Sequence, residues 1–304
     1  MFFLLKLVDY YFKLLQYIFN YLIQGSAAQL LAFLNFQEFI MKKILFGLTA
    51  LVLSLVLSGC AKKDAKVITV GATPEPHAAM LNLIVEDMAA QGYTLKVREF
   101  TDYVTPNEAV EAGEIDANFF QHVPYMDSFN QERNYHLKSV IGTHVEPLAL
   151  YSKKYKKLAD LPEGAIIAIP NDPTNEGRAL LLLQSAGLIT LDSKAGLTAV
   201  PADITNNSKK FKFQEIEAAS LPRVLDDTDA AVINGNYAIP VGLKATKDGL
   251  VVEGAESPYE NIVTVKEGKE NDPAIKALAK AITSQKVKDY LQKTYPNGEV
   301  VPVF

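Results

Sequence analysis

The stretch that decides the fold is VITVGATPEPHAAMLNLIVEDMAAQGYTLKVREF, residues 67–100. Its first four residues form a short apolar run that ends at Gly71, as a buried strand does. Residues 77–90 contain neither glycine nor proline, and we expect a helix there that stops at Gly92. Residues 95–100 alternate with period two, which predicts the next strand. This order predicts a βαβ unit with two parallel strands in one sheet.

The alternation of strands and helices continues to the end of the chain. We expect strands at 115–119, 138–143, 165–169, 211–216, 230–233 and 262–265, an extended segment at 148–151, and helices at 106–112, 123–133, 178–185, 221–225 and 273–294. These elements form two α/β series that are together too long for one comfortable core. We therefore predict an α/β fold with two lobes and a ligand cleft between them.

Residues 41–59 are typical of a secretory signal: Lys42 and Lys43 precede an uncharged, leucine-rich stretch that closes with small residues. Ser58 and Gly59 before Cys60 resemble a lipobox, where bacterial lipoproteins are cleaved and acylated. Cys60 is the only cysteine, so the chain has no internal disulfide and no multi-cysteine metal site. Alternatives are an accidental cysteine after a signal peptide, or a plain membrane anchor.

The remaining N-terminal residues fall outside the predicted fold. Residues 1–40 precede a complete signal with its own Met41, so we interpret them as an unused upstream start; an extra membrane helix at residues 2–22 is the alternative. Residues 60–66 form a polar tether behind the lipid anchor.

Charge argues against nucleic acid as a partner. Residues 1–59 hold four of the 30 basic and two of the 35 acidic side chains, so the remainder carries 26 and 33, a net charge of −7. Phosphate binding requires a basic face instead.

Two segments resemble each other: EIDANFFQH at residues 114–122 and DTDAAVING at residues 227–235. Each reads as an acidic turn, Asp-Ala, a buried strand, and polar groups just past it. Ligands of open α/β sheets bind outside the carboxyl ends of strands. We therefore expect Gln121, His122 and Asn234 to face one cleft.

The sharpest local feature is PNDPTNEGRAL, residues 170–180, where a buried strand leads through capping residues into a leucine-rich helix. A helix start offers free N–H groups and a positive dipole end to an anion. Arg178 in the first turn would oppose that dipole, so we expect its guanidinium to bind a carboxylate. The alternative is a surface salt bridge with Glu176 or a neighbour.

No motif in the sequence indicates a catalytic site. No nucleophile elbow, phosphate loop or paired-carboxylate signature stands out. The four histidines show no metal-ligand spacing, and we expect His122 to be structural or to line a pocket. We therefore predict no enzyme activity, no metal and no cofactor.

Motifs along residues 60–304 resemble the NlpA-type lipoproteins, the methionine-binding components of ABC importers. In chain order they read LSGC, VGATPEPHA, FTDYVTPN, DANFFQHVPY, NDPTNEGRALLLL, DAAVINGNYA and SPYENIV. The resemblance implies a two-lobed periplasmic-binding-protein fold, type II-like. We expect residues 67–147 with 250–304 to form one lobe and residues 148–249 the other. Crossovers are expected at residues 145–150 and between residues 242 and 254.

The resemblance also implies a binding site for L-methionine. Arg178 would hold the ligand carboxylate, and Asn234 and Asn261 would contact its amino and carboxylate groups. The thioether would be surrounded by four further residues: Tyr103, Phe120, His122 and Tyr125. A buried zwitterion needs paired polar groups, and a thioether packs well against ring edges. Glu75, between two prolines, departs from the family pattern, so contact of its loop with the ligand is open.

The implied partners are L-methionine, an ABC permease and the membrane, reached through lipid on Cys60 at the extracytoplasmic face. The implied function is capture by hinge closure and delivery to the permease. Alternatives are the same fold tuned to another amino acid or small peptide, and a surface-exposed enzyme or adhesive lipoprotein.

Overall fold

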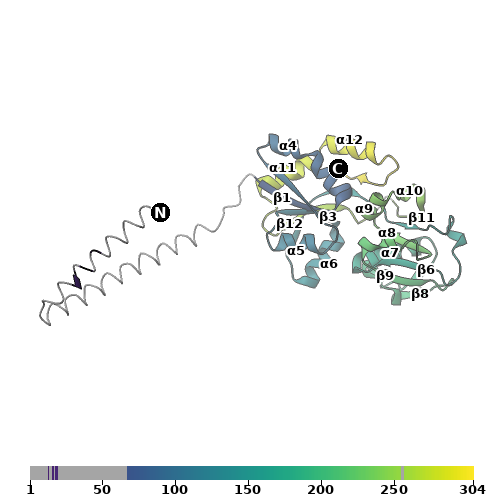
Figure 1. Ribbon diagram of the computed structural model, residues 1–304. Helices are drawn as coiled ribbons and strands as arrows, with labels where there is room; N and C mark the ends of the chain where they lie inside the picture. The colour runs from purple at the N-terminus through teal and green to yellow at the C-terminus, as the bar shows by residue number, and fades with distance from the viewer. Residues whose placement is uncertain (1–12, 14–15, 17, 20–66, 255–256) are drawn as a thin grey trace. The chain divides into compact units, whose positions relative to one another are not determined.

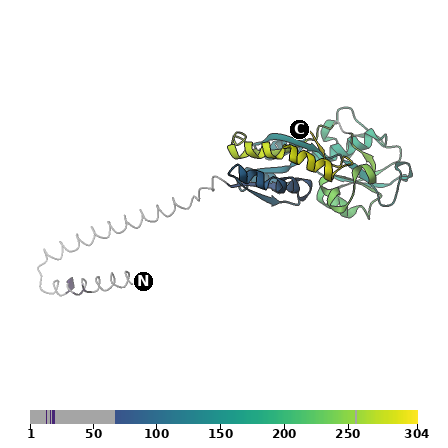
Figure 2. The same ribbon diagram turned by 90° about the horizontal axis from the view of Figure 1, so that it is seen from above.

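The computed structural model describes residues 13, 16, 18, 19, 67–254 and 257–304. The predicted signal peptide, Cys60 and the tether lie outside these residues. None of the described helices has the length and apolar character needed to span a bilayer. From Val67 onward the chain forms two lobes, each built on its own sheet (Figures 1 and 2).

The first lobe has a six-stranded mixed sheet in the order β13-β4-β12-β3-β1-β2. Its strands are β1 (Val67–Ala72), β2 (Thr94–Glu99), β3 (Ala117–His122), β4 (Leu137–Val145), β12 (Asn261–Lys266) and β13 (Val301–Pro302). Strands β1 and β2 are parallel neighbours, with Val67 opposite Thr94, so the predicted βαβ unit is confirmed. Strand β12 runs antiparallel between β3 and β4.

Helices cover both faces of this sheet (Figure 1). They are α3 (Ala79–Leu83), α4 (Val85–Ala90), α5 (Thr105–Glu111), α6 (Val123–Arg133), α11 (Pro273–Ile282) and α12 (Gln285–Thr294), and a single turn, η1 (Pro74–Ala78), follows β1. One face packs Ile68 and Phe119 against the first and last helices, and the other packs Ile262 against α5 and α6. The first lobe therefore unites the first and the last elements of residues 67–304.

The second lobe has a five-stranded sheet in the order β11-β5-β10-β6-β9. Its strands are β5 (Ala149–Tyr151), β6 (Ile166–Pro170), β9 (Lys212–Ile216), β10 (Ala230–Ile233) and β11 (Gly249–Val252), with a small ribbon of β7 (Thr190–Leu191) and β8 (Ile204–Asn206) beside it. Its helices are α7 (Pro173–Ser185), α8 (Leu221–Val224), α9 (Gly235–Ala238) and α10 (Ala245–Asp248). Short 3₁₀ turns are η2 (Leu158–Asp160), η3 (Gly196–Thr198), η4 (Pro201–Asp203), η5 (Ala218–Ser220) and η6 (Ile239–Val241).

Strand alternation divides the core of the second lobe into two layers. On β10, Ala230 and Val232 pack with the leucines of α7, whereas Ala231 and Ile233 pack with α8 and α9. Successive side chains of a strand point to opposite faces, so a strand covered on both sides is apolar throughout. This explains the uninterrupted apolar run that predicts β10.

The chain crosses between the lobes twice in the described residues. The first crossover, residues 146–148, lies between β4 and β5 as predicted. The second lies between β11 and β12, after residue 252. Strand β11 pairs with β5, so the prediction that residues 250–252 belong to the first lobe is wrong, and the second crossover begins only at the end of the predicted interval between residues 242 and 254.

Two predicted helices are interrupted. The expected helix at 273–294 is divided into α11 and α12, because Ser284 is extended (φ −78°, ψ 159°) and stands as the N-cap of α12. The expected helix at 77–90 breaks at Ile84 and begins in the η1 turn. In both places the apolar spacing continues across the break, so periodicity alone predicts one continuous helix.

Candidate functional site

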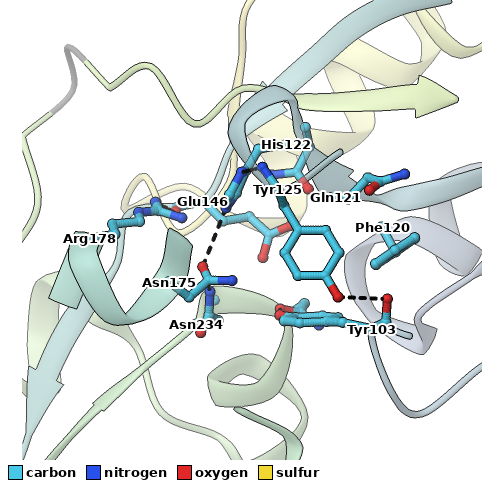
Figure 3. Close-up of a pocket in the computed structure, with 12 residues that line it drawn as sticks. Tyr103, Phe120, Gln121, His122, Tyr125, Glu146, Asn175, Arg178 and Asn234 are labelled. Carbon is cyan, nitrogen blue, oxygen red and sulfur yellow. Dashed lines mark hydrogen bonds between the residues drawn. The ribbon is translucent and has the colours of Figure 1, made fainter. Parts of the chain in front are cut away.

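One pocket between the lobes brings all seven predicted site residues together (Figure 3). Tyr103, Phe120, His122, Tyr125 and Asn261 come from the first lobe, and Arg178 and Asn234 from the second. The pocket is also lined by Gln121, Glu146, Asn175, Gly235 and Asn236. Most lining residues lie at the ends of strands or in the first turns that follow them.

The two similar segments of the sequence form equivalent structures. The backbone and carboxylate of Asp116 both bond Thr69 at the start of β1, at 2.8 and 2.7 Å. Asp229 makes the same pair of bonds to Ile166 at the start of β6, at 3.0 and 2.8 Å. Each aspartate thus ties the start of β3 or β10 to a neighbouring strand, and at the carboxyl ends of β3 and β10 Asn234 meets Gln121 and His122 at the pocket as predicted.

Helix α7 starts earlier than the sequence predicts. It begins at Pro173, and Asp172 caps it by accepting a hydrogen bond from the N–H of Asn175 at 3.0 Å. The prediction that Arg178 lies in the first turn is wrong, because proline is well suited to a first helical position and the expected loop is itself helical. The Asp172 carboxylate already accepts a hydrogen bond from an N-terminal N–H group of α7. The anion site predicted at this helix terminus is therefore occupied by a side chain of the protein itself.

Arg178 is buried and makes contacts on several sides. Its Nε donates to Glu253 at 2.9 Å, and Nη2 donates to Glu253 and, at 2.9 Å, to the carbonyl oxygen of Glu146. Its guanidinium lies over the ring of Tyr259, 4.3 Å from the centroid. Arg178 does not pair with Glu176, the alternative partner predicted from the sequence. Its guanidinium pairs instead with Glu253, a glutamate in the second crossover.

Three aromatic rings wall one side of the pocket. The ring centroids of Tyr103, Phe120 and Tyr125 lie 5.7 to 6.0 Å apart in tilted and edge-to-face pairs. Tyr103 donates its hydroxyl to Oδ1 of Asn236 at 2.6 Å, across the lobes, and Tyr237 donates to the carbonyl of Thr101 at 3.1 Å. The lobes are therefore closed over the pocket.

His122 is both a helix cap and a pocket residue. Its Nδ1 accepts from the N–H of Tyr125 at 3.1 Å, so its Nε2 carries the proton and donates to Oδ1 of Asn175 at 3.3 Å. Burial, and then the charge of Arg178, lower the pKa of His122 to about 3. His122 is thus neutral and structurally satisfied, as the sequence predicts.

Glu146 lies in the first crossover and is the main pocket residue that sequence reasoning missed. Its Oε1 lies 2.9 Å from Nε2 of His144 and 3.3 Å from Nε2 of His77. The nearest atoms of His77, His144 and Glu146 lie within 4.8 Å of one another, and all three residues are buried. A glutamate followed by proline in a loop gives no periodic signal; its flanking strands, which the sequence does predict, could have pointed to it.

Several buried polar atoms around the pocket lack a protein partner. They include Oδ1 of Asn234, Nδ2 of Asn236 and the hydroxyl of Tyr259. The Nδ2 group of Asn234 is already bound to Oδ1 of Asn175 at 2.8 Å. Because leaving such groups unpaired in the interior is costly, their presence together indicates a site that a polar ligand completes.

Comparison with known proteins identifies the family of this fold and pocket. The family model for NlpA lipoproteins matches residues 68–304. The chain belongs to the NlpA lipoprotein family. This confirms the resemblance found in the sequence motifs.

Relatives within the NlpA lipoprotein family carry related names. The chain is 48% identical over 250 residues to the membrane lipoprotein TpN32 of Treponema pallidum, covering 82% of this chain and 93% of that one. It is 40% identical over 273 residues to the methionine-binding lipoprotein MetQ of Bacillus subtilis, covering 86% and 99%. A solved nutrient-binding protein of Burkholderia cenocepacia, bound to methionine, is 45% identical, with a TM-score of 0.75 over 78% of this chain and all of that one.

Proposed function

We propose that this NlpA lipoprotein binds L-methionine between its lobes and delivers it to an ABC permease. The observation that carries the proposal is the pocket itself, which presents a guanidinium, a carboxyl group and an aromatic wall to one enclosed space. The names of its relatives support the same ligand. Binding and release are sufficient for this function, with no bond of the ligand broken.

The polar half of the pocket suits the zwitterionic end of an amino acid. Arg178 would bind the ligand carboxylate, for which its fork geometry is well suited. The free Oδ1 of Asn234 is an acceptor for an ammonium group, and Asn261 lines the same region. A buried zwitterion needs such partners, because an unpaired charge is expensive in the interior.

The apolar half suits a flexible thioether. Tyr103, Phe120 and Tyr125 present ring edges and faces, and His122 completes the wall while neutral. Sulfur–aromatic contacts contribute about 0.3–1.5 kcal/mol each. A charged or strongly polar side chain would find no partner at this wall.

Closure follows from the way the lobes are joined. Hinge motion at residues 146–148 and 253–254 would open the pocket, and the interlobe bonds of Tyr103 and Tyr237 would form again around the ligand. We propose residues 67–147 and 261–304 as one moving body and residues 148–252 as the other. A lipid on Cys60 would hold the protein at the extracytoplasmic face of the membrane, beside the permease; two acyl chains suffice for stable anchoring.

Titration calorimetry with a panel of free amino acids tests the ligand. The protein is first unfolded and refolded, because a carried-over ligand would raise its apparent stability. We expect L-methionine to bind, and Arg178→Ala to weaken it by about 30-fold to several thousand-fold, since losing one partner of a buried charge pair costs about 2–5 kcal/mol. Arg178→Lys keeps the charge but loses the fork, so it should also bind weakly.

Arg133→Ala is the matched control, because Arg133 forms a half-exposed ion pair with Glu108, of the kind that contributes little. Its affinity should equal that of the unchanged protein. Methionine binding that survives in Arg178→Ala would contradict the assigned role, and binding of other amino acids alone would contradict the assigned ligand.

A further inference from the structure

The crossover residue Glu146 faces two buried histidines under the pocket. His144 comes from the end of β4, His77 from the η1 turn, and both are fully shielded from solvent. Glu146 lines the pocket from the same position. The hydrogen atoms in this group follow from its neighbours, because each contact needs one donor and one acceptor.

The tautomer of His144 is fixed by Thr143. The hydroxyl of Thr143 donates to the carbonyl oxygen of Asn261 at 3.0 Å, which uses its one proton. The same hydroxyl lies 2.9 Å from Nδ1 of His144, so Nδ1 must donate to it. A neutral His144 then has a bare lone pair on Nε2, which points at Oε1 of Glu146 at 2.9 Å. Two acceptors at that distance require a hydrogen between them.

His77 cannot supply that hydrogen. Its Nδ1 is held by the hydroxyl of Thr73 at 2.8 Å, and its Nε2 faces only oxygens: Oδ1 of Asn261 at 3.0 Å and Oε1 of Glu146 at 3.3 Å. Nε2 therefore carries a hydrogen and donates to these oxygens, which is the ordinary neutral tautomer. The hydrogen shared by Glu146 and His144 is a separate one.

We propose that Glu146 joins Asn234 in recognising the ammonium group of the bound amino acid, by giving up a proton that it shares with His144 in the free protein. The inference rests on the proposed function. In the free protein Oε1–H donates to Nε2 of His144. On binding, the O–H bond breaks, the proton leaves to solvent, and the carboxylate turns away from Nε2 of His144 to accept hydrogen bonds from the ammonium group of the ligand.

Charges around Glu146 fit this exchange. Burial raises the pKa of Glu146, while His77, Arg178 and the backbone N–H of Asn236 oppose that rise. Burial lowers the pKa of His144 to about 3, so the proton belongs to the carboxyl group. An ammonium group nearby would favour the ionised carboxylate and lower its pKa.

The sign of the pH dependence follows from proton counting. The free protein holds one more proton than the complex, so methionine affinity should fall as pH falls below the pKa of free Glu146, approaching tenfold per pH unit. Above that pKa the carboxylate is already ionised and affinity should level off. The ammonium group of the ligand stays charged throughout this range.

The test is calorimetry of methionine binding in buffers of different ionisation enthalpy, from about pH 5 to pH 8. We expect proton release per methionine to be greatest at the acid end, where it approaches one, and to decline as pH rises. Methionine binding with no proton release at any pH overturns the inference alone, whereas no methionine binding overturns the proposed function.

Three variants sharpen the result. Glu146→Gln should bind methionine at least tenfold more weakly and release no proton. Thr143→Val, outside the pocket lining, frees His144 to protonate Nε2, so it should still bind methionine but release fewer protons; unchanged release would refute the assigned tautomer. Glu176→Gln, which alters a glutamate outside the pocket, should release protons as the unchanged protein does. Zinc bound stoichiometrically to the purified protein would also refute the proposal.

Discussion

Gly235 sets how closely the second lobe approaches Glu146, and replacing it with alanine gives a sharp prediction. It is the first residue of α9, directly after Asn234. A Cβ at this position would lie 2.8 Å from both Cβ and Oε2 of Glu146. The Oε2 atom can swing away, but Cβ of Glu146 is fixed by the backbone of the crossover. Either α9 or the crossover must therefore move.

The size of the effect follows from that overlap. Carbon atoms pack at about 3.5–4.0 Å, so one of the two backbones has to shift by more than half an ångström. Overpacking of this kind costs about 1–3 kcal/mol. For a domain of this size each kcal/mol lowers the melting temperature by about 2–4 °C, so a fall of about 2–12 °C is expected.

Methionine binding should suffer more than stability, because the displaced atoms belong to the pocket. We expect Gly235→Ala to lose most of its methionine affinity in calorimetry while remaining folded. Gly254→Ala is the control for stability: a Cβ there meets nothing within 4 Å, so the melting temperature should not fall. Gly235→Ala with unchanged affinity would show that the approach of Glu146 to α9 does not shape the pocket.

Two other changes test the closed form and the acid groups. Tyr103→Phe removes the interlobe bond to Asn236, and one hydrogen bond contributes about 0.5–1.5 kcal/mol, so methionine affinity measured by calorimetry should fall by about 2- to 12-fold; no change would mean that this bond does not favour closure. Burial raises the pKa of Glu176 to about 7, so the folded state binds more protons than the unfolded one and stability should fall as pH rises from about 4.5 to 7. Glu176→Gln should flatten that part of the melting-temperature profile, and an unaltered profile would contradict the shift.

Much of the fold could be predicted because its signals are local. Strand β10 and helix α6 lie where the sequence places them, since a buried apolar run and a proline at the helix start each depend on a few residues. The break at Ser284 could not be predicted in this way. Residues 273–294 keep their apolar spacing throughout, and only packing of α11 and α12 against the first lobe separates them.

Prediction of the site also succeeded for local signals and failed for a long-range pairing. Tyr103, Phe120, His122, Tyr125, Arg178, Asn234 and Asn261 were all expected in one cleft, and the pocket contains them. Their strand-end positions explain this success, because strand ends of two sheets face one cleft. Glu253 was not expected as the partner of Arg178, because it is 75 residues away in the sequence and the pairing exists only when α7 faces the second crossover.

The residues that escaped prediction, Glu146 and Glu253, both lie in the crossovers, and this has a consequence for how binding and closure are joined. Arg178 bonds the carboxylate of Glu253 and the carbonyl of Glu146, so one side chain of α7 is tied to both connections between the lobes. A ligand carboxylate that draws on this guanidinium must change its bonds to those crossovers. The group proposed to bind the ligand carboxylate therefore also contacts both crossovers, and we expect methionine capture and lobe closure to depend on the same side chain.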